Sequence, residues 1–242
     1  MAYSILQLAE QYQLDDEWTL DALETLADIS YRRGNIEESD SLVRQYRRLA
    51  EQRGIEPEPS RSIFLAREEW ERACAHFTTA LQRSEPFPKP SVVALLAELA
   101  VMTGKDADIQ QEYCERAVTL AEQSGARKFL AIALRARGRM YLEQERWEAA
   151  EDNLKQALSQ CELLDIPWER GQTLYCLGLY YRRHADVVNR TDFEERADAR
   201  AADLGLAHSY FEQALGFFES LKAEHDGERA RLALTQDSKA PV

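Results

Sequence analysis

The sequence predicts an all-α fold, an α-solenoid in which antiparallel helix pairs stack one on the next. The segments Leu8–Gln11, Leu120–Gln123 and Leu158–Cys161 each close an apolar helical pattern, and a short polar turn and a second amphipathic helix follow each of them. Only 10 of the 242 residues are glycine and 7 are proline, which suits helices with short connections. Since one pair cannot bury its own apolar face, repeated pairs must stack.

Helical periodicity and turn signals give the expected elements in order. Their ranges are 2–13, 16–33, 36–53, 60–67, 69–84, 90–103, 107–124, 127–144, 147–164, 168–184, 204–223 and 226–236. The helix near 60–67 is short because Pro57 and Pro59 interrupt what precedes it. Residues 1–236 thus form one array of about five helix pairs with a capping helix, and residues 237–242 form a flexible tail.

The last pair carries an insertion. Gly138 and Ala150 lie 12 positions apart, whereas the equivalent Gly178 and Ala207 lie 29 apart, which places about 17 extra residues near 185–201. The insertion is charged and favours helix. Two interpretations stay open: a solvated helical extension, or a projection that contacts a partner.

Three segments resemble the tetratricopeptide repeat, in which a first helix carries Gly or Ala and then Tyr, and a second carries Ala, a large apolar residue and Ala. The matches are Gly138 and Tyr141 with Ala150, Leu154 and Ala157; Gly178 and Tyr181 with Ala207, Phe211 and Ala214; and Ala73, Phe77 and Ala80. The resemblance implies a right-handed superhelix. Small residues allow the partner helix to approach, and large ones fill the space beside them.

In that family the first helices line a concave face whose projecting side chains contact the partner. Carrying the repeat register over gives the candidates Tyr31, Arg32, Arg135, Arg139, Tyr175, Leu179, Arg182 and Arg183. The arginines stand out because the formal net charge of the chain is −13. With Tyr175 they suit a partner segment that carries carboxylates and an apolar anchor. The alternative is that they pair with the chain's own Asp and Glu.

The spacing of 40 residues between Gly138 and Gly178 exceeds the family's usual period of about 34. With turns such as Gly125–Arg127 and Asp165–Trp168, it resembles the C-terminal repeats of bacterial STAND-type signal-transduction ATPases. The resemblance implies a sensor that binds a ligand and releases autoinhibition of an ATPase domain. Residues 2–13 look like a second helix without its first, so we expect a C-terminal fragment of a larger protein. A stand-alone adaptor is the alternative.

Motifs for catalysis or cofactors do not occur. The sequence has no G-x-x-x-x-G-K-[ST] phosphate loop, no G-x-G-x-x-G and no H-E-x-x-H. The four histidines are far apart in sequence: His76, His184, His208 and His225. We therefore expect no enzyme activity, no cofactor and no metal site.

The acidic charge disfavours nucleic acid and anionic membranes as partners. No apolar run approaches the roughly 18–20 residues that span a bilayer, and no signal peptide is evident. The four cysteines lie within apolar helical patterns, as buried thiols of a reducing compartment do: Cys74, Cys114, Cys161 and Cys176. The expected location is cytoplasmic and the expected partner is a protein or peptide, with a small-molecule inducer as the alternative.

Overall fold

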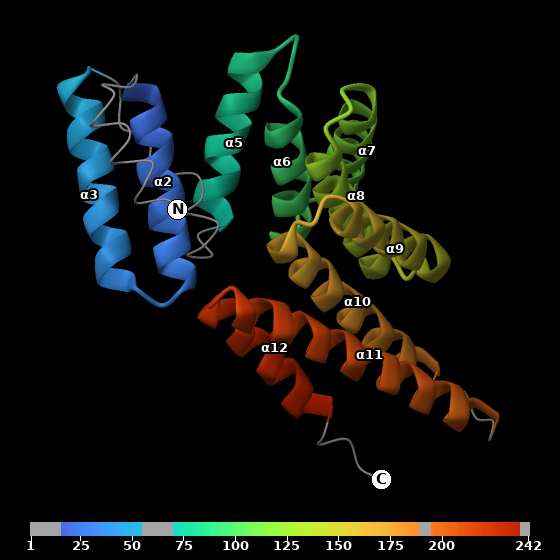
Figure 1. Cartoon of the computed structure of the whole chain (residues 1–242). Coiled ribbons are helices and arrows are strands. Elements are labelled where there is room, and N and C mark those ends of the chain that lie inside the picture. The colour runs from blue at the N-terminus through green and yellow to red at the C-terminus, as the bar shows by residue number, and fades with distance from the viewer. Residues whose placement is uncertain (1–15, 55–69, 189–194, 238–242) are drawn as a thin grey trace. The chain divides into compact units, whose positions relative to one another are not determined.

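The computed structural model describes residues 16–54, 70–188 and 195–237, and these fold into helices joined by turns (Figure 1). No strand occurs within those ranges, so the predicted all-α class is confirmed for them. The helices are α2 (Asp16–Arg32), α3 (Ile36–Gln52), α5 (Trp70–Ser84), α6 (Pro90–Met102), α7 (Ala107–Gln123), α8 (Arg127–Glu143), α9 (Trp147–Leu163), α10 (Pro167–Val188), α11 (Glu195–Ser220) and α12 (Glu224–Asp237). The helices expected at 2–13 and near 60–67 lie outside the described residues.

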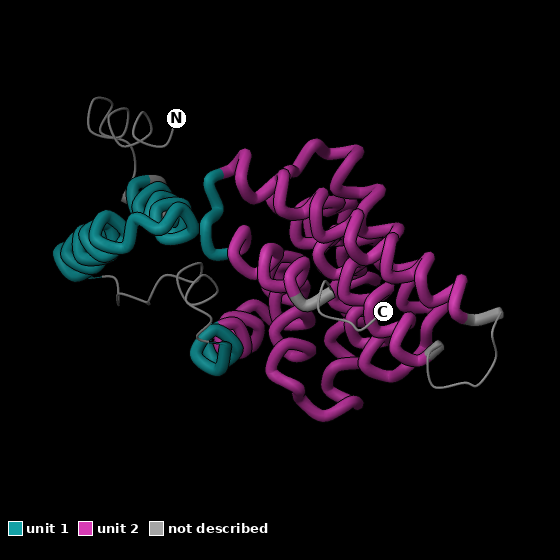
Figure 2. Tube along the Cα trace, turned by 90° about the horizontal axis from the view of Figure 1, so that it is seen from below, with its two compact units in different colours: residues 1–76, 222–225 teal, residues 77–221, 226–242 magenta. Residues whose placement is uncertain are grey.

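Contacts divide the chain into two compact units, which Figure 2 colours separately. Residues 1–76 and 222–225 form the first unit, and residues 77–221 and 226–242 form the second. In the first unit α2 packs against α3, and the two bury a small apolar core. That core consists of Leu23, Leu26, Ala27 and Leu42, with Val43, Tyr46 and Leu49 packed against it.

In the second unit the helices from α6 to α11 pack on their neighbours in the sequence. Helix α6 contacts α7 and α8, α8 contacts α7 and α9, and α10 contacts α9 and α11. Alternate helices also touch, because α8 contacts both α6 and α10. Among the described helices, none is long and apolar enough to cross a membrane.

Two glycines set the distance between paired helices. A Cβ on Gly138 would lie 2.8 Å from Cγ of Leu154 on α9, and a Cβ on Gly178 would lie 2.6 Å from the ring of Phe211 on α11. Leu154 and Phe211 are both fully buried. The predicted packing of a small residue against a large one is therefore confirmed in both pairs. Gly171 makes a third contact of this kind, since its Cβ would lie 2.8 Å from the ring of Phe218.

One turn geometry recurs at the ends of α7, α8 and α9. Its second residue has a left-handed backbone: Gly125 with φ 66°, Glu145 with φ 56° and Asp165 with φ 49°. In each turn the next residue donates its backbone N–H to the carbonyl five residues earlier, at 2.9 to 3.2 Å. This bond is the signature of the Schellman helix ending. The internal repeat therefore extends from the helices to the turns that join them.

The last pair is longer than predicted. We expected helices at 168–184 and 204–223, whereas α10 ends at Val188 and α11 begins at Glu195. The reason is local: residues 185–204 contain neither glycine nor proline and are rich in alanine and charged residues, so both helices extend past the predicted boundaries. The described parts of the insertion lengthen both helices.

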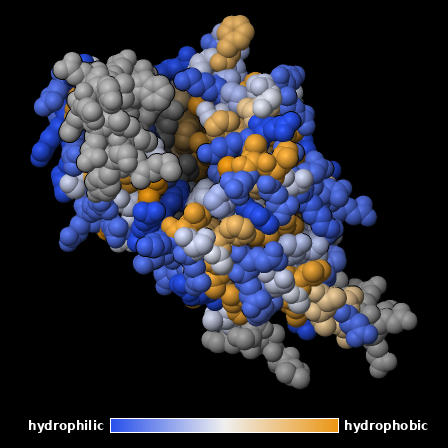
Figure 3. Space-filling view, in the orientation of Figure 1, coloured by the Kyte–Doolittle hydropathy of each residue, from blue (hydrophilic) through white to orange (hydrophobic). Residues whose placement is uncertain are grey.

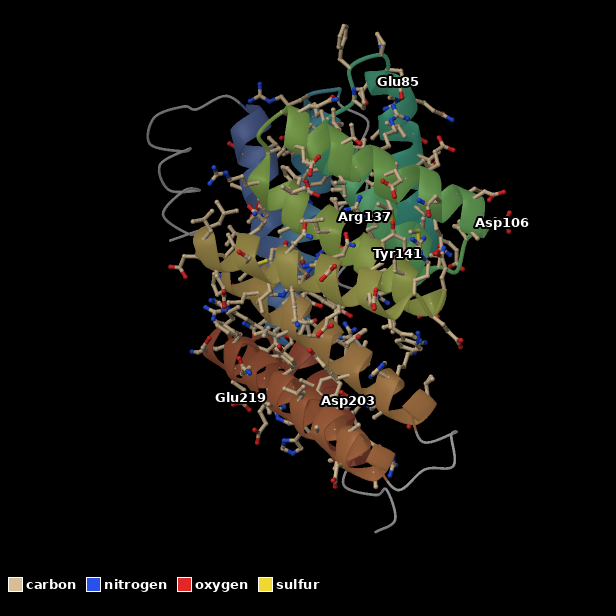
Figure 4. All side chains as sticks on the ribbon, turned by 90° about the vertical axis from the view of Figure 1, so that its right-hand side faces the viewer. Glu85, Asp106, Arg137, Tyr141, Asp203 and Glu219 are labelled. Carbon is tan, nitrogen blue, oxygen red and sulfur yellow. The ribbon has the colours of Figure 1, made fainter. Side chains whose placement is uncertain are left out.

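Polar contacts join α7, α8 and α9 beside the apolar core (Figure 4). Arg137 donates through Nε to Oδ1 of Asn153 at 2.7 Å, and its Nη1 lies 3.2 Å from Oε2 of Glu115. The Tyr141 hydroxyl donates to the same Glu115 carboxylate at 3.4 Å. The adjacent Cys114 is buried, and burial raises the pKa of its thiol to about 12.

Candidate functional site on helices α8 and α10

Arg135 lies in the interior of the second unit, with a relative exposure of 1%. Its Nη2 lies 2.8 Å from Oε1 of Glu98 on α6, and its Nη1 lies 2.7 Å from Oε2 of Glu169 on α10. Burial alone lowers the pKa of Arg135, but the two carboxylates raise it above its usual value. One guanidinium therefore links three alternate helices.

The buried position of Arg135 means that the prediction of a partner-contacting role for this residue was wrong. We expected its side chain on the face that contacts a partner, whereas the structure encloses it between two carboxylates. The alternative, that an arginine pairs with the chain's own acidic residues, describes Arg135. The sequence could not show this, because Glu98 and Glu169 lie more than thirty positions away on either side.

Arg139 lies one turn further along α8 and differs from Arg135 in its surroundings. Its side chain is half-buried, and it has no carboxylate partner in the part of the chain that the structure describes. Burial raises the pKa of the Cys176 thiol on α10, and the Arg139 guanidinium is the strongest influence that opposes this rise. Arg139 therefore lies close to α10, and no carboxylate of the described residues neutralises its charge.

Tyr175 and Leu179 lie one turn apart on α10, so they share a side of this helix. Both are half-buried. The Tyr175 ring lies 5.4 Å from that of Phe211, and the guanidinium of Arg229 on α12 lies 5.0 Å from the Tyr175 centroid. We call the surface formed by Arg139, Tyr175, Leu179 and Arg229 the α8–α10 face.

The other candidate residues take different positions. The Arg182 guanidinium lies 5.3 Å from the Phe211 centroid, which directs it towards α11. Arg183 is exposed and pairs with Glu143 of α8 at 2.7 Å. Tyr31 and Arg32 belong to the first unit, where Arg32 Nε lies 2.8 Å from Oδ1 of Asp28. Of the eight candidates, the α8–α10 face thus contains Arg139, Tyr175 and Leu179.

Sequence reasoning missed the contribution of α12. Asp226 is buried and accepts hydrogen bonds from Trp168 Nε1 at 3.1 Å and from Gln172 Nε2 at 2.8 Å. These bonds fix the start of α12 beside α10 and place Arg229 near Tyr175. More than fifty residues separate the partners, and no local pattern marks such a pairing.

The view in Figure 3 shows hydrophobic residues interspersed with hydrophilic ones. No group of three or more His, Cys, Asp or Glu within residues 16–54, 70–188 and 195–237 could hold a metal ion.

Comparison with known proteins found neither a matching family model nor a matching curated protein. The chemistry of the α8–α10 face is therefore the basis for proposing a function.

Proposed function

We propose that the chain is a tetratricopeptide-type α-solenoid that binds an acidic segment of a protein or peptide on the α8–α10 face. The packing of Gly138 against Leu154 and of Gly178 against Phe211 supports the repeat type, as does the recurrent turn. The contacts from α6 to α8 and from α8 to α10 support a continuous array of first helices in a right-handed superhelix.

The binding proposal rests on the absence of a described carboxylate partner for Arg139. The chain has 43 acidic and 30 basic residues, so carboxylates are abundant, yet Arg139 pairs with none that the structure describes. A guanidinium forms strong, directional hydrogen bonds with a carboxylate. Tyr175 and Leu179 offer half-exposed apolar surface on the neighbouring helix. An acidic segment with one aromatic or aliphatic anchor fits this combination.

On the resemblance to bacterial signalling ATPases, we extend the proposal to a ligand-sensing role within a larger protein. The ligand would act by binding one conformation of the array more tightly than another, which shifts the population towards an active state. In the larger protein, ligand-dependent ATPase activity would support this role. Binding without any effect on nucleotide turnover would favour a stand-alone adaptor instead.

The test uses a short fluorescein-labelled peptide in which glutamates surround one phenylalanine, followed by fluorescence anisotropy. Arg139→Glu should weaken binding about tenfold or more, since the variant replaces an attraction with a repulsion. The melting temperature should hardly change, because no described ion pair is lost.

Arg127→Glu is the matched control, since Arg127 is exposed on the same helix and the change in net charge is identical. It should leave the affinity within about twofold. Equal losses in the two variants would show a general effect of charge and would contradict a site at Arg139.

A further inference from the structure

The connection between α10 and α11 carries an acidic sequence around one aromatic residue. Residues 189–194 lie outside the described residues, and their sequence is Asn-Arg-Thr-Asp-Phe-Glu. Glu195, the first residue of α11, follows them. Phe193 therefore has Asp192 on one side and Glu194 and Glu195 on the other. This order matches the ligand that fits the α8–α10 face, an acidic segment with one aromatic anchor.

The aromatic residue belongs to the insertion and not to the repeat. Phe193 is the only Phe, Tyr or Trp between Tyr181 and Tyr210. The equivalent connection of α8–α9 is residues 144–146, with the sequence Gln-Glu-Arg and no aromatic residue. The packing of a helix pair therefore does not require a ring at this point of the chain.

Two contacts fix the register in which α10 and α11 run past each other. A Cβ on Gly178 would lie 2.6 Å from the ring of Phe211, and His184 Nδ1 lies 2.7 Å from Oδ2 of Asp203. The residue number rises along α10 as it falls along α11, so the helices are antiparallel, as Figure 1 shows. Extended in this register, α11 begins about 14 positions beyond the level of Leu179.

The acidic connection cannot reach the α8–α10 face of its own chain. About 14 positions correspond to roughly 21 Å at 1.5 Å per helical residue. Phe193 precedes the first residue of α11 by two positions, which span at most about 7 Å. Along the helix axis, its backbone therefore stays roughly 14 Å from Leu179 and roughly 20 Å from Tyr175. A contact between this segment and the face requires a second copy of the chain.

We propose that residues 191–195 of one copy bind the α8–α10 face of a second copy, so that the chain recognises itself. This inference rests on the proposed function, because it names the acidic segment that the face receives. It also selects between the two interpretations of the insertion: the insertion contacts a partner, and that partner is the same chain.

The charges and the apolar groups of the two surfaces are complementary. Arg139 is half-buried and has no carboxylate partner among the described residues, and a carboxylate of Asp192 or Glu194 supplies one. The ring of Phe193 packs on the half-exposed side of Tyr175. Two copies with a formal net charge of −13 each repel one another overall, so the attraction must come from a local pairing of this kind.

The experiment measures self-association of the full chain by sedimentation velocity over a range of protein concentrations. The wild-type chain should associate reversibly. Phe193→Ala should weaken the association about tenfold or more, because the aromatic anchor is lost. Asp192→Asn with Glu194→Gln should weaken it about tenfold, because Arg139 loses its partner. A wild-type chain that stays monomeric at about 1 mM would overturn the proposal.

Asp186→Asn with Asp198→Asn is the matched control. It removes the same charge from exposed positions of α10 and α11 in the same insertion. Both double variants lower the general repulsion between two acidic chains equally, so the control should leave association unchanged or slightly stronger. Equal weakening in the two double variants would contradict recognition of residues 191–195.

An exchange of charges tests the pairing directly. Arg139→Glu and the double variant Asp192→Lys with Glu194→Lys should each be monomeric alone, because like charges then face each other. A mixture of the two should form a heterodimer, since each face again meets a segment of opposite charge. A mixture that stays monomeric would overturn the pairing of Arg139 with this segment.

The fluorescein-labelled peptide of glutamates around one phenylalanine separates this inference from the proposed function. Phe193→Ala keeps the α8–α10 face, so the peptide should bind this variant at least as tightly as the wild type. Peptide binding with self-association that no change in residues 191–195 weakens would leave the proposed function standing and refute self-recognition. Loss of peptide binding in Phe193→Ala would also refute it, since the ring would then belong to the face.

Discussion

The pairs α8–α9 and α10–α11 share one type of packing contact, in which a large side chain covers a glycine. The two pairs differ in the residues that make this contact and in the lengths of their helices. Leu154 covers Gly138 in the first, and Phe211 covers Gly178 in the second. Helices α8 and α9 have 17 residues each, whereas α10 has 22 and α11 has 26. The contact between a glycine and a large side chain therefore sets how closely two helices approach, while the surrounding sequence sets how far they run.

The difference in length has a consequence for the surface. In α8–α9 a short turn through Glu145 joins the helices directly. In α10–α11 both helices continue beyond the shared contact, and this added part brings Asp203 beside His184. The longer pair thus adds a polar contact between α10 and α11 to an otherwise repeated framework.

Removing Arg135, which links α8 of the first pair to α10 of the second, should have the largest effect on the free energy of unfolding. Arg135→Ala leaves the buried carboxylates of Glu98 and Glu169 without their cation, and should lower the free energy of unfolding by about 3–5 kcal/mol. Arg183→Ala removes the exposed pair with Glu143 and should cost about 0–1 kcal/mol. Urea unfolding followed by circular dichroism measures both.

If Arg135→Ala costs no more than Arg183→Ala, the ion pairs of Arg135 do not hold the two pairs together. Arg135→Lys is a more specific test. A lysine keeps the positive charge but lacks the planar guanidinium that contacts both carboxylates. It should recover only part of the lost stability.

The two glycine contacts should differ in their tolerance of a methyl group. Gly178→Ala should lower the free energy of unfolding by about 2 kcal/mol, because three atoms of the Phe211 ring lie within 2.9 Å of the new Cβ. Gly138→Ala should cost less, about 1 kcal/mol, because Leu154 is smaller and can change rotamer. Thermal or urea melts of both variants rank them directly.

Phe211→Leu converts the contact of α10–α11 into that of α8–α9. In this background Gly178→Ala should cost about 1 kcal/mol, and the cycle of variants should be non-additive. Additive effects would mean that Phe211 is not the group that the methyl meets.

Substitutions in the turns should change stability by about 1 kcal/mol or less, and their sign should depend on which residue is replaced. Glu145 and Gly125 occupy equivalent left-handed positions, and only glycine adopts that backbone without strain. Glu145→Gly should therefore raise the free energy of unfolding by about 0.5–1 kcal/mol, whereas Gly125→Ala should lower it by about 1 kcal/mol. Calorimetric melting of both variants checks the signs, and two changes of the same sign would contradict the equivalence of the turns.

Most helices of the described part could be placed from the sequence, because helical periodicity and turn residues are local signals. The range expected for α8 was 127–144, and the structure gives Arg127–Glu143. The largest differences from the prediction lie where local signals were weak, at the end of α10 and the start of α11. There the insertion had no residue that ends a helix, and the predicted boundary relied on the length of an ordinary repeat.

The site was less predictable than the fold, as the two arginines of α8 show. Arg135 and Arg139 have equivalent positions one turn apart, and no sequence pattern distinguishes them. In the structure one is enclosed by carboxylates and the other has none among the described residues. The face of a helix follows from its own sequence, but the groups it meets belong to other helices.

The sequence by itself determined the helices, their turns and the packing of Gly138 and Gly178, since each depends on residues that are close in the chain or on a repeated spacing. Only the tertiary structure decided which charges are neutralised. Ion pairs such as those of Arg135 join residues more than thirty positions apart, as does the grouping of Trp147 with Tyr180. Electrostatic interactions depend on distance in space, and that distance is set only when the helices have packed.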